Sequence, residues 1–231
     1  MLSVKNLLFS YGAVRVLHNV SMLMKPARVT CVMGRNGVGK TTLMKNVMGL
    51  LSPVSGEIIV NDCDLTGLSA NERAKVGIGL VPQGRQIFPK LTIEENLRVG
   101  LQARQDKKPS IPESVYEMFP VLKEMSRRKG GDLSGGQQQQ LAIARALVGK
   151  PRILLLDEPT EGIQPNIIQQ IGRVLQQLVE TQQMTIVLVE QYLDFVREFG
   201  HDFYVMDRGQ VVAEGQTAEL TEEVVKTHLT V

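Results

Sequence analysis

The sequence predicts an α/β fold in which helices cover both faces of a parallel sheet. Three short runs of branched apolar residues are typical of buried strands, at 29–33 (VTCVM), 153–156 (ILLL) and 185–189 (TIVLV). Residues 165–180 carry apolar side chains at helical spacing, and Pro165 suits the first turn of that helix. Strands that alternate with helices in this way favour a parallel sheet.

The N-terminal part of the chain predicts a different arrangement. Residues 1–30 and 54–62 are typical of short strands joined by turns, and turns are expected at 11–12 (Tyr-Gly) and 55–56 (Ser-Gly). We therefore expect an antiparallel β flank beside the parallel sheet.

A mainly helical segment interrupts the α/β pattern. Residues 92–129 are polar and helical in character, with a loop expected at 105–112, and the chain contains no internal repeat. We expect a single domain over residues 1–231, with a helical subdomain over roughly 86–150 inserted in the α/β core. The last residues, 215–231, predict a strand end and a short helix and carry no recognisable chemistry.

The composition narrows the class of protein. The chain has 231 residues, 43% of them hydrophobic, and 26 basic against 24 acidic side chains give a net charge of +2, unlike the strongly basic face of a nucleic-acid binder. Cys31 and Cys63 stand alone, so neither a metal site nor a disulfide framework is indicated. No apolar run approaches the ~18 residues of a membrane helix, and the first residues lack the pattern of a signal peptide. We expect a cytoplasmic chain that can still work at a membrane through a partner.

Residues 34–41 (GRNGVGKT) fit the phosphate-loop pattern of Gly, four residues, Gly-Lys-Thr. A predicted strand precedes the loop and a predicted helix follows it, which favours this interpretation over a glycine-rich turn that caps a helix. Glycines let successive N–H groups turn towards phosphate oxygens, and the helix start adds partial positive charge. We expect Lys40 to reach the β- and γ-phosphates of ATP and the Thr41 hydroxyl to bind Mg²⁺. The predicted nucleotide-binding residues of this loop are Gly34, Arg35, Asn36, Gly37, Val38, Gly39, Lys40, Thr41 and Thr42.

Two carboxylates follow the predicted strand ILLL at its C-terminal end, the edge at which open α/β sheets bind ligands. Asp157 is placed to hold the Mg²⁺ shell, and Glu158 is placed to orient or polarise an attacking water. The alternative is an ordinary strand end followed by a turn at 158–160. A phosphate loop on the same sheet favours a phosphoryl-transfer site.

Residues 133–140 (LSGGQQQQ) predict the start of an amphipathic helix, although glutamine runs are often disordered. Ser134 and Gln137 form a capping box, and apolar residues at helical spacing follow. Gly135 and Gly136 leave the helix start bare, and a bare start that offers N–H groups binds anions. Because the chain already has one phosphate loop, we expect Ser134–Gln137 to close on a nucleotide held by another chain.

These three motifs, in this order and spacing, resemble the ATP-binding subunits of ABC transporters, and the resemblance spans the whole chain. It implies a RecA-like P-loop NTPase core, an antiparallel β flank and a helical subdomain that carries the signature LSGGQ. It also implies ATP and Mg²⁺ as cofactors. The dimer it implies is head-to-tail, with each ATP between one chain's phosphate loop and the other's signature.

Single positions resemble those of the same family. Tyr11 resembles the aromatic residue that stacks on adenine, with a turn aromatic as the alternative, and Val16 would pack beside the same base or in the core. Gln83, in VPQGRQIFP, resembles the glutamine that senses Mg²⁺ and couples to the membrane subunit. Gln191 stands where the family usually has a histidine, and Gln164 where it usually has an aspartate. Glutamine can hydrogen-bond a γ-phosphate but carries no charge, and we expect Gln191 in the catalytic set.

The segments VEQ, QGR-IFP and EPTEGIQP resemble the importers of branched-chain amino acids and urea, and GRNGVGKTT with EGIQP resembles the urea-type subunit most. In that branch two different ATPase subunits pair beneath two membrane permease subunits, at the cytoplasmic face of the inner membrane, and an extracytoplasmic binding protein feeds them. The resemblance implies uptake of urea or a related short amide, with branched-chain amino acid uptake as the alternative. The isolated chain could also form a homodimer, since it carries both half-sites, and no nucleic-acid partner is expected.

Three other classes fit the sequence less well. A soluble ABC-type ATPase of DNA repair or translation usually carries long coiled coils or two cassettes, and a small-molecule phosphotransferase has no use for LSGGQ. An exporter ATPase differs mainly in its membrane partners, and the segment around Gln83 together with Gln191 favours the importer.

Overall fold

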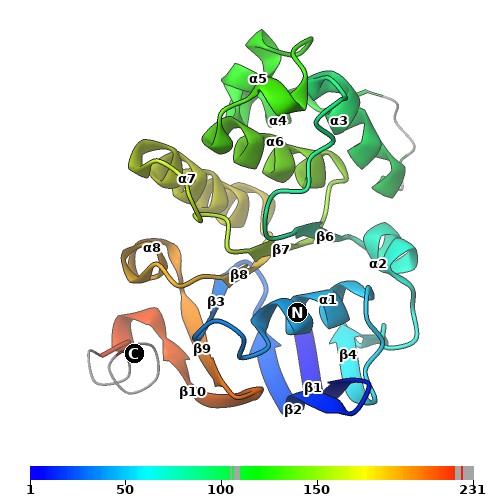
Figure 1. Cartoon of the computed structure of the whole chain (residues 1–231), viewed down its shortest axis with the longest axis vertical. Helices are drawn as coiled ribbons and strands as arrows, with labels where there is room; N and C mark the ends of the chain where they lie inside the picture. The colour runs from blue at the N-terminus through cyan, green and yellow to red at the C-terminus, as the bar shows by residue number, and fades with distance from the viewer. Residues whose placement is uncertain (105, 107–109, 222–224, 226–231) are drawn as a thin grey trace.

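The computed structural model describes residues 1–104, 106, 110–221 and 225, and its strands form two sheets (Figure 1). The antiparallel sheet has the order β2-β1-β4-β5, with bounds Val14–Met24, Leu2–Tyr11, Ser55–Val60 and Cys63–Asp64. The central sheet has the order β10-β9-β3-β8-β7-β6, with bounds Gln210–Gln216, Asp202–Asp207, Val29–Met33, Thr185–Val189, Ile153–Asp157 and Ile78–Val81. All pairs in the central sheet are parallel except β9 with β10. The predicted parallel sheet and antiparallel flank are both confirmed.

Eight α-helices are described around these sheets. Their bounds, from α1 to α8, are Lys40–Met48, Ala70–Val76, Ile93–Gly100, Glu113–Met118, Pro120–Glu124, Gly135–Val148, Pro165–Gln182 and Leu193–Phe199. Short 3₁₀ turns lie at Leu101–Ala103, Gly130–Asp132 and Thr217–Glu219. Among the described residues, no helix combines the length and the apolar character that crossing a membrane requires.

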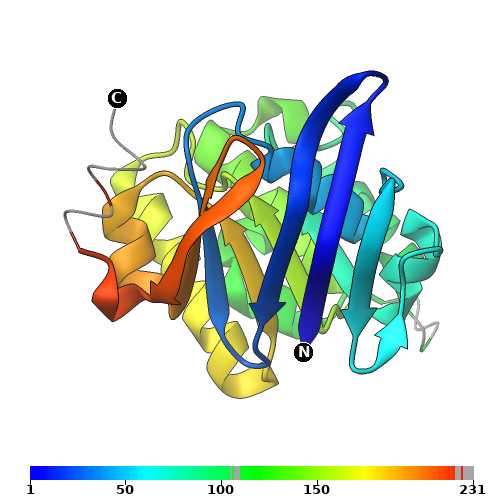
Figure 2. The same ribbon diagram turned by 90° about the horizontal axis from the view of Figure 1, so that it is seen from below.

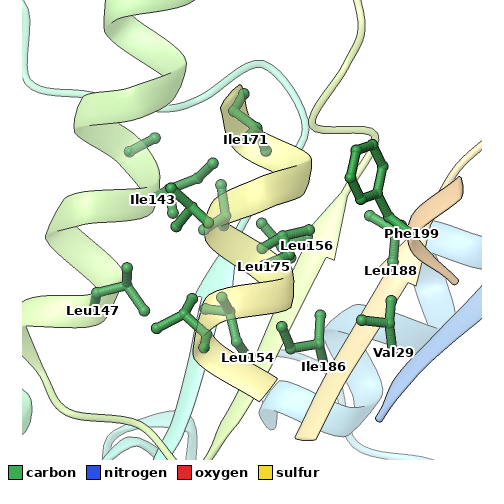
Figure 3. Close-up of a cluster of buried hydrophobic side chains, with 14 of the residues drawn as sticks. Val29, Ile143, Leu147, Leu154, Leu156, Ile171, Leu175, Ile186, Leu188 and Phe199 are labelled. Atoms are coloured by element: carbon green, nitrogen blue, oxygen red, sulfur yellow. The ribbon is translucent and has the colours of Figure 1, made fainter. Parts of the chain in front are cut away.

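The central strands are apolar throughout because both of their faces are covered. In β7, Leu154 and Leu156 pack with α6, α7 and α8, whereas Ile153 and Leu155 pack with α1 and the antiparallel sheet. Figure 3 shows α7, which carries Ile171, lying between α6 and the strands. Complete burial of each such side chain stabilises the fold by about 2 kcal/mol. The continuous apolar runs of the sequence are the pattern of strands that are buried on both faces.

The elements divide into layers that bring distant parts of the chain together. Helices α3 to α6 gather at one end of the molecule (top of Figure 1), and α6 packs against α3. Figure 2 shows β1, β2 and β4, in blue to cyan, as a layer beside the β9–β10 hairpin, and β10 contacts β2. The phosphate-loop segment begins where β3 ends; its Gly34 lies against β9 of the central sheet and its Gly39 against β2 of the antiparallel sheet.

The structure bears on two local expectations, a turn at 55–56 and a loop at 105–112. The turn predicted at 55–56 is wrong, because both residues lie inside β4. Gly56 has φ 101°, and a Cβ there would lie 2.6 Å from the Asn6 carbonyl oxygen, so this glycine allows a close approach of β4 to β1. Half of the loop predicted at 105–112 (residue 105 and residues 107–109) lies outside the described residues, as does most of the predicted C-terminal helix; the strand end is confirmed, since β10 ends at Gln216.

Candidate nucleotide site

The phosphate-loop segment joins the buried strand β3 to the helix α1, as the sequence predicts. Gly34, the first residue after β3, has φ 144°, and any Cβ there would collide with the Met206 carbonyl oxygen of β9. Lys40 is the first residue of α1, and no acidic residue occupies the first turn of that helix. The N–H groups and the positive end of α1 therefore face the loop without a competing carboxylate on the helix.

Lys40 is held at the centre of the loop. Its side chain is 5% exposed, and Nζ donates hydrogen bonds to the carbonyl oxygens of Gly34 (2.6 Å) and Arg35 (2.9 Å). The same Nζ lies 3.8 Å from Oε1 of Glu158. Burial lowers the pKa of Lys40, and the nearby carboxylates of Glu158 and Asp157 partly counteract this. Lys40 therefore carries the positive charge of a pocket that also contains acidic side chains.

Asp157, the last residue of β7, is 3% exposed and lies close to α1. Burial raises the pKa of its carboxyl group, and hydrogen bonding with Thr41 offsets part of that rise. Oδ1 of Asp157 is buried and has no hydrogen-bond partner in the described structure. A buried carboxylate oxygen without a donor, next to a hydroxyl group, suits a hard cation such as Mg²⁺. The described residues contain no cluster of three or more His, Cys, Asp or Glu side chains for a metal; Mg²⁺ typically binds through one or two carboxylates and substrate phosphates.

Side chains from neighbouring loops hydrogen-bond to the Glu158 carboxylate. Its backbone is left-handed (φ 50°), and its N–H donates to the Val189 carbonyl oxygen (2.9 Å). Oε2 accepts a hydrogen bond from Nε2 of Gln83 (2.9 Å), and Oε1 accepts one from Nε2 of Gln191 (2.6 Å). Nε2 of Gln191 also donates to Oδ1 of Asn36 in the phosphate loop (2.7 Å). The carboxylate is thus aimed by amide side chains from the loops after β6 and β8.

These side chains surround a cavity of about 600 Å³. Ten of the predicted site residues line it, namely Val16, Asn36, Gly37, Gly39, Lys40, Thr41, Thr42, Gln83, Glu158 and Gln191. The structure also places there four residues that the sequence did not single out: Thr160, Glu161, Glu190 and Tyr192. The sequence pattern does not mark these four, because each is a polar or aromatic residue that directly follows a better-known motif.

Several predicted residues lie outside this lining. Tyr11 ends β1, is 48% exposed and packs edge-on against Phe9, with ring centroids 4.8 Å apart. Val38 is buried and belongs to the core between α1 and the antiparallel sheet. The remaining predicted residues that do not line the cavity are Gly34, Arg35, Asp157 and the segment Ser134–Gln137.

The segment Ser134–Gln137 starts α6 and forms the expected capping box. Ser134 Oγ accepts from the Gln137 N–H (3.4 Å), and Gln137 Oε1 accepts from the Ser134 N–H (3.0 Å). The glutamine run is ordered: Gln140 is buried and donates to Oε1 of Gln170 in α7 (2.8 Å). The start of α6 lies against the Arg85 guanidinium, since a Cβ on Gly135 would lie 3.1 Å from Nη1. None of the four residues Ser134–Gln137 lines the cavity.

Known proteins with similar sequences are ATP-binding proteins of transporters. A family model described as ABC transporter matches residues 17–161. The chain is 38% identical over 228 residues to the high-affinity branched-chain amino acid transport ATP-binding protein BraG of Pseudomonas aeruginosa, with 95% of the chain and 94% of BraG covered. It is 36% identical over 224 residues to the probable branched-chain amino acid transport ATP-binding protein LivF of Archaeoglobus fulgidus, with 96% and 94% covered.

A solved structure with the same fold is also an ATP-binding cassette. An ATP-binding cassette in a dimeric post-hydrolysis state, bound to ADP and Pi, superposes with a TM-score of 0.84 at 28% identity. The match covers 94% of this chain and 99% of that one. The predicted α/β core with its antiparallel flank is therefore the fold of a nucleotide-hydrolysing cassette.

Proposed function

Because the chain belongs to the ABC transporter family, in which ATP hydrolysis is coupled to transport, we propose that it energises an importer of branched-chain amino acids. The observation that carries this proposal is the 38% identity to BraG, which extends over 95% of the chain. LivF, at 36% identity over 96% of the chain, supports the same solute class. None of the described side chains is proposed to touch the solute, so the solute class rests on these relatives.

Urea is the second candidate solute. Its support is the similarity of GRNGVGKTT (34–42) and EGIQP (161–165) to the urea-type subunit of the same branch. The two relatives favour amino acids over this reading, so urea or a short amide ranks second. Both candidates use the same ATPase chemistry.

In the proposed site, the phosphates of ATP lie in the cavity over the phosphate loop. Lys40 would bind the β- and γ-phosphates, and Thr42 and the loop N–H groups would bind the remaining oxygens. Val16 would pack beside the base, and Tyr11 would stack on it if nucleotide binding brings that exposed ring inward. Mg²⁺, when bound, would neutralise phosphate charge, with oxygen ligands from Thr41, Gln83 and Asp157.

Glu158 would orient the attacking water. Gln191 would keep its hydrogen bond to Glu158 and turn the N–H that donates to Asn36 towards the γ-phosphate. The hydrogen bonds from Gln191 to Glu158 and to Asn36 support this role. A glutamine at this position contributes hydrogen bonds but no positive charge, so the lysine is the principal cation of the site. Gln164, the other departure from the family pattern, is the N-cap residue of α7 and makes no side-chain capping bond.

The proposed assembly contains two ATPase subunits. Ser134, Gly135, Gly136 and Gln137 would contact the γ-phosphate held by the partner, which we propose to be a second, different ATPase subunit in the transporter and a second copy in isolation. Two membrane permease subunits would contact the segment around Gln83, at the cytoplasmic face of the inner membrane, and a binding protein would deliver the solute. The dimeric cassette with 28% identity supports the paired arrangement.

Uptake measurements in cells test the solute class. Cells without this chain would be compared with cells that express the wild type or Lys40→Ala, using labelled leucine and labelled urea at low external concentration. Loss of leucine uptake alone, restored by the wild type only, is the expected result. Loss of urea uptake alone would move the chain to the second candidate, and unchanged uptake of both would refute the importer proposal.

A further inference from the structure

Glu190 is a buried carboxylate with four hydrogen-bond donors around it. It directly follows β8 and is 3% exposed. Oε1 accepts from the Thr160 N–H (3.0 Å) and hydroxyl (2.7 Å), and Oε2 accepts from the N–H groups of Gln191 (2.9 Å) and Tyr192 (3.2 Å). Its own N–H donates to the Val32 carbonyl oxygen in β3 (3.3 Å). One side chain therefore joins the loop after β7 to the loop after β8.

Each of these two loops carries a side chain of the proposed catalytic set. Thr160 lies two residues after Glu158, whose left-handed backbone persists only if its surroundings hold it in place. The hydrogen bond from the Glu158 N–H to Val189 holds the turn at one point, and the bonds from Thr160 to Glu190 hold it at a second. The loop after β8 carries Gln191, whose amide contacts the Glu158 carboxylate.

The contacts of Glu190 also exclude a second role for it. Both carboxylate oxygens already accept two hydrogen bonds each, so neither is oriented to take a proton from a water molecule. The side chain acts only as a hydrogen-bond acceptor, and it holds the donor groups of the two loops in place.

We propose that Glu190 is a positioning residue for ATP hydrolysis. By hydrogen-bonding to both loops that carry Glu158 and Gln191, it fixes these two side chains relative to each other. The inference rests on the roles proposed above for Glu158 and Gln191, and it does not depend on which solute is transported. It extends the site to a residue that does no chemistry itself.

Glu190→Gln tests this role with little change in size. The new NH₂ group would face two donors, so the loops lose part of their connection. We expect kcat for ATP hydrolysis to fall about tenfold or more while ATP affinity stays within about threefold. Thr160→Val, which removes a single hydroxyl contact, should lower kcat by a smaller factor and provides a milder variant if Glu190→Gln folds poorly. Asp202→Asn is the matched control, because Asp202 is a carboxylate 8% exposed at the start of β9 that pairs with Arg28 and does not line the cavity, so kcat of this variant should stay at the wild-type value.

A double-mutant cycle separates positioning from general damage. In a Gln191→Ala background, Glu190→Gln should lower kcat less than it does in the wild type, because one of the two side chains that Glu190 positions is already gone. An unchanged kcat in Glu190→Gln, an equal loss of ATP affinity, or full additivity with Gln191→Ala would overturn the inference. Near-normal hydrolysis by Glu158→Gln and Gln191→Ala would instead remove the site roles on which it rests.

Discussion

At the scale of single residues, the Lys40 side chain hydrogen-bonds back to the phosphate loop that precedes it. Its ammonium group bonds two carbonyl oxygens of the loop and lies beside Glu158. The same group would have to move its bonds to phosphate oxygens when ATP binds. Charge-assisted bonds to phosphate are stronger than bonds to neutral carbonyls, so the exchange favours the nucleotide.

Lys40→Ala should therefore weaken ATP binding. We expect the Kd to rise about tenfold or more, because a charge-assisted hydrogen bond in a buried site is lost. Isothermal titration calorimetry measures this directly. Lys45→Ala, which removes an exposed lysine from the same helix, should bind ATP as the wild type does. Equal affinity in the wild type and Lys40→Ala would count against the phosphate-loop assignment.

Glu158→Gln should separate binding from turnover. The amide keeps the size of the side chain but cannot take up a proton, so ATP should still bind while kcat falls about a hundredfold or more. Steady-state phosphate release and nucleotide binding would be measured on the same preparation. Glu180→Gln, an exposed position in α7, is the control that should leave both unchanged. Near-normal phosphate release by Glu158→Gln would remove Glu158 from its proposed role.

The sequence is informative about residues that are proposed to touch the nucleotide, and much less so about the residues that hold those side chains in place. Lys40 and Glu158 belong to motifs whose spacing predicts their position. Glu190 has no such motif, and its importance depends on Thr160, which lies 30 residues away in the chain. A contact of that kind becomes visible only when the parallel strands β7 and β8 set their two following loops side by side.

At the scale of elements, burial on both faces makes the central strands easy to predict from the sequence. The antiparallel flank lacks such continuous apolar runs, and one of its turns is predicted wrongly. The runs at 29–33, 153–156 and 185–189 are apolar throughout, and they form three adjacent strands of the central sheet. The expected turn at 55–56 was wrong because Ser-Gly is a common turn pair. Here Gly56 serves a close contact between strands instead, and no local pattern distinguishes the two uses.

Gly56→Ala should accordingly destabilise the antiparallel sheet. A Cβ would collide with the backbone of Asn6 and Leu7, and the left-handed backbone disfavours alanine, so we expect a loss of about 2 kcal/mol or more in the free energy of unfolding. Urea unfolding followed by circular dichroism measures the loss. Gly67→Ala is the control, since nothing lies within 4 Å of a Cβ there and its stability should change little. Equal stability of the two variants would show that β1 and β4 can move apart at no cost.

At the scale of the whole molecule, the start of α6 does not line the cavity of its own chain. The cavity is lined by the phosphate loop and the loops after β6, β7 and β8, whereas Ser134–Gln137 contributes no lining residue. We propose that both features bind phosphate, and within one chain only the phosphate loop lines the cavity. This arrangement is the physical reason to expect two chains around each ATP.

The most direct test of that expectation is ATP hydrolysis by a mixture of two inactive variants. Lys40→Ala removes the phosphate-loop cation, and Ser134→Glu puts a negative charge at the start of α6, where it would repel the phosphate. Each variant alone should be inactive. Mixing them should restore measurable hydrolysis, because a mixed dimer contains one intact loop facing one intact signature. Wild-type rates from Ser134→Glu alone, or a mixture no more active than its components, would contradict the two-chain site.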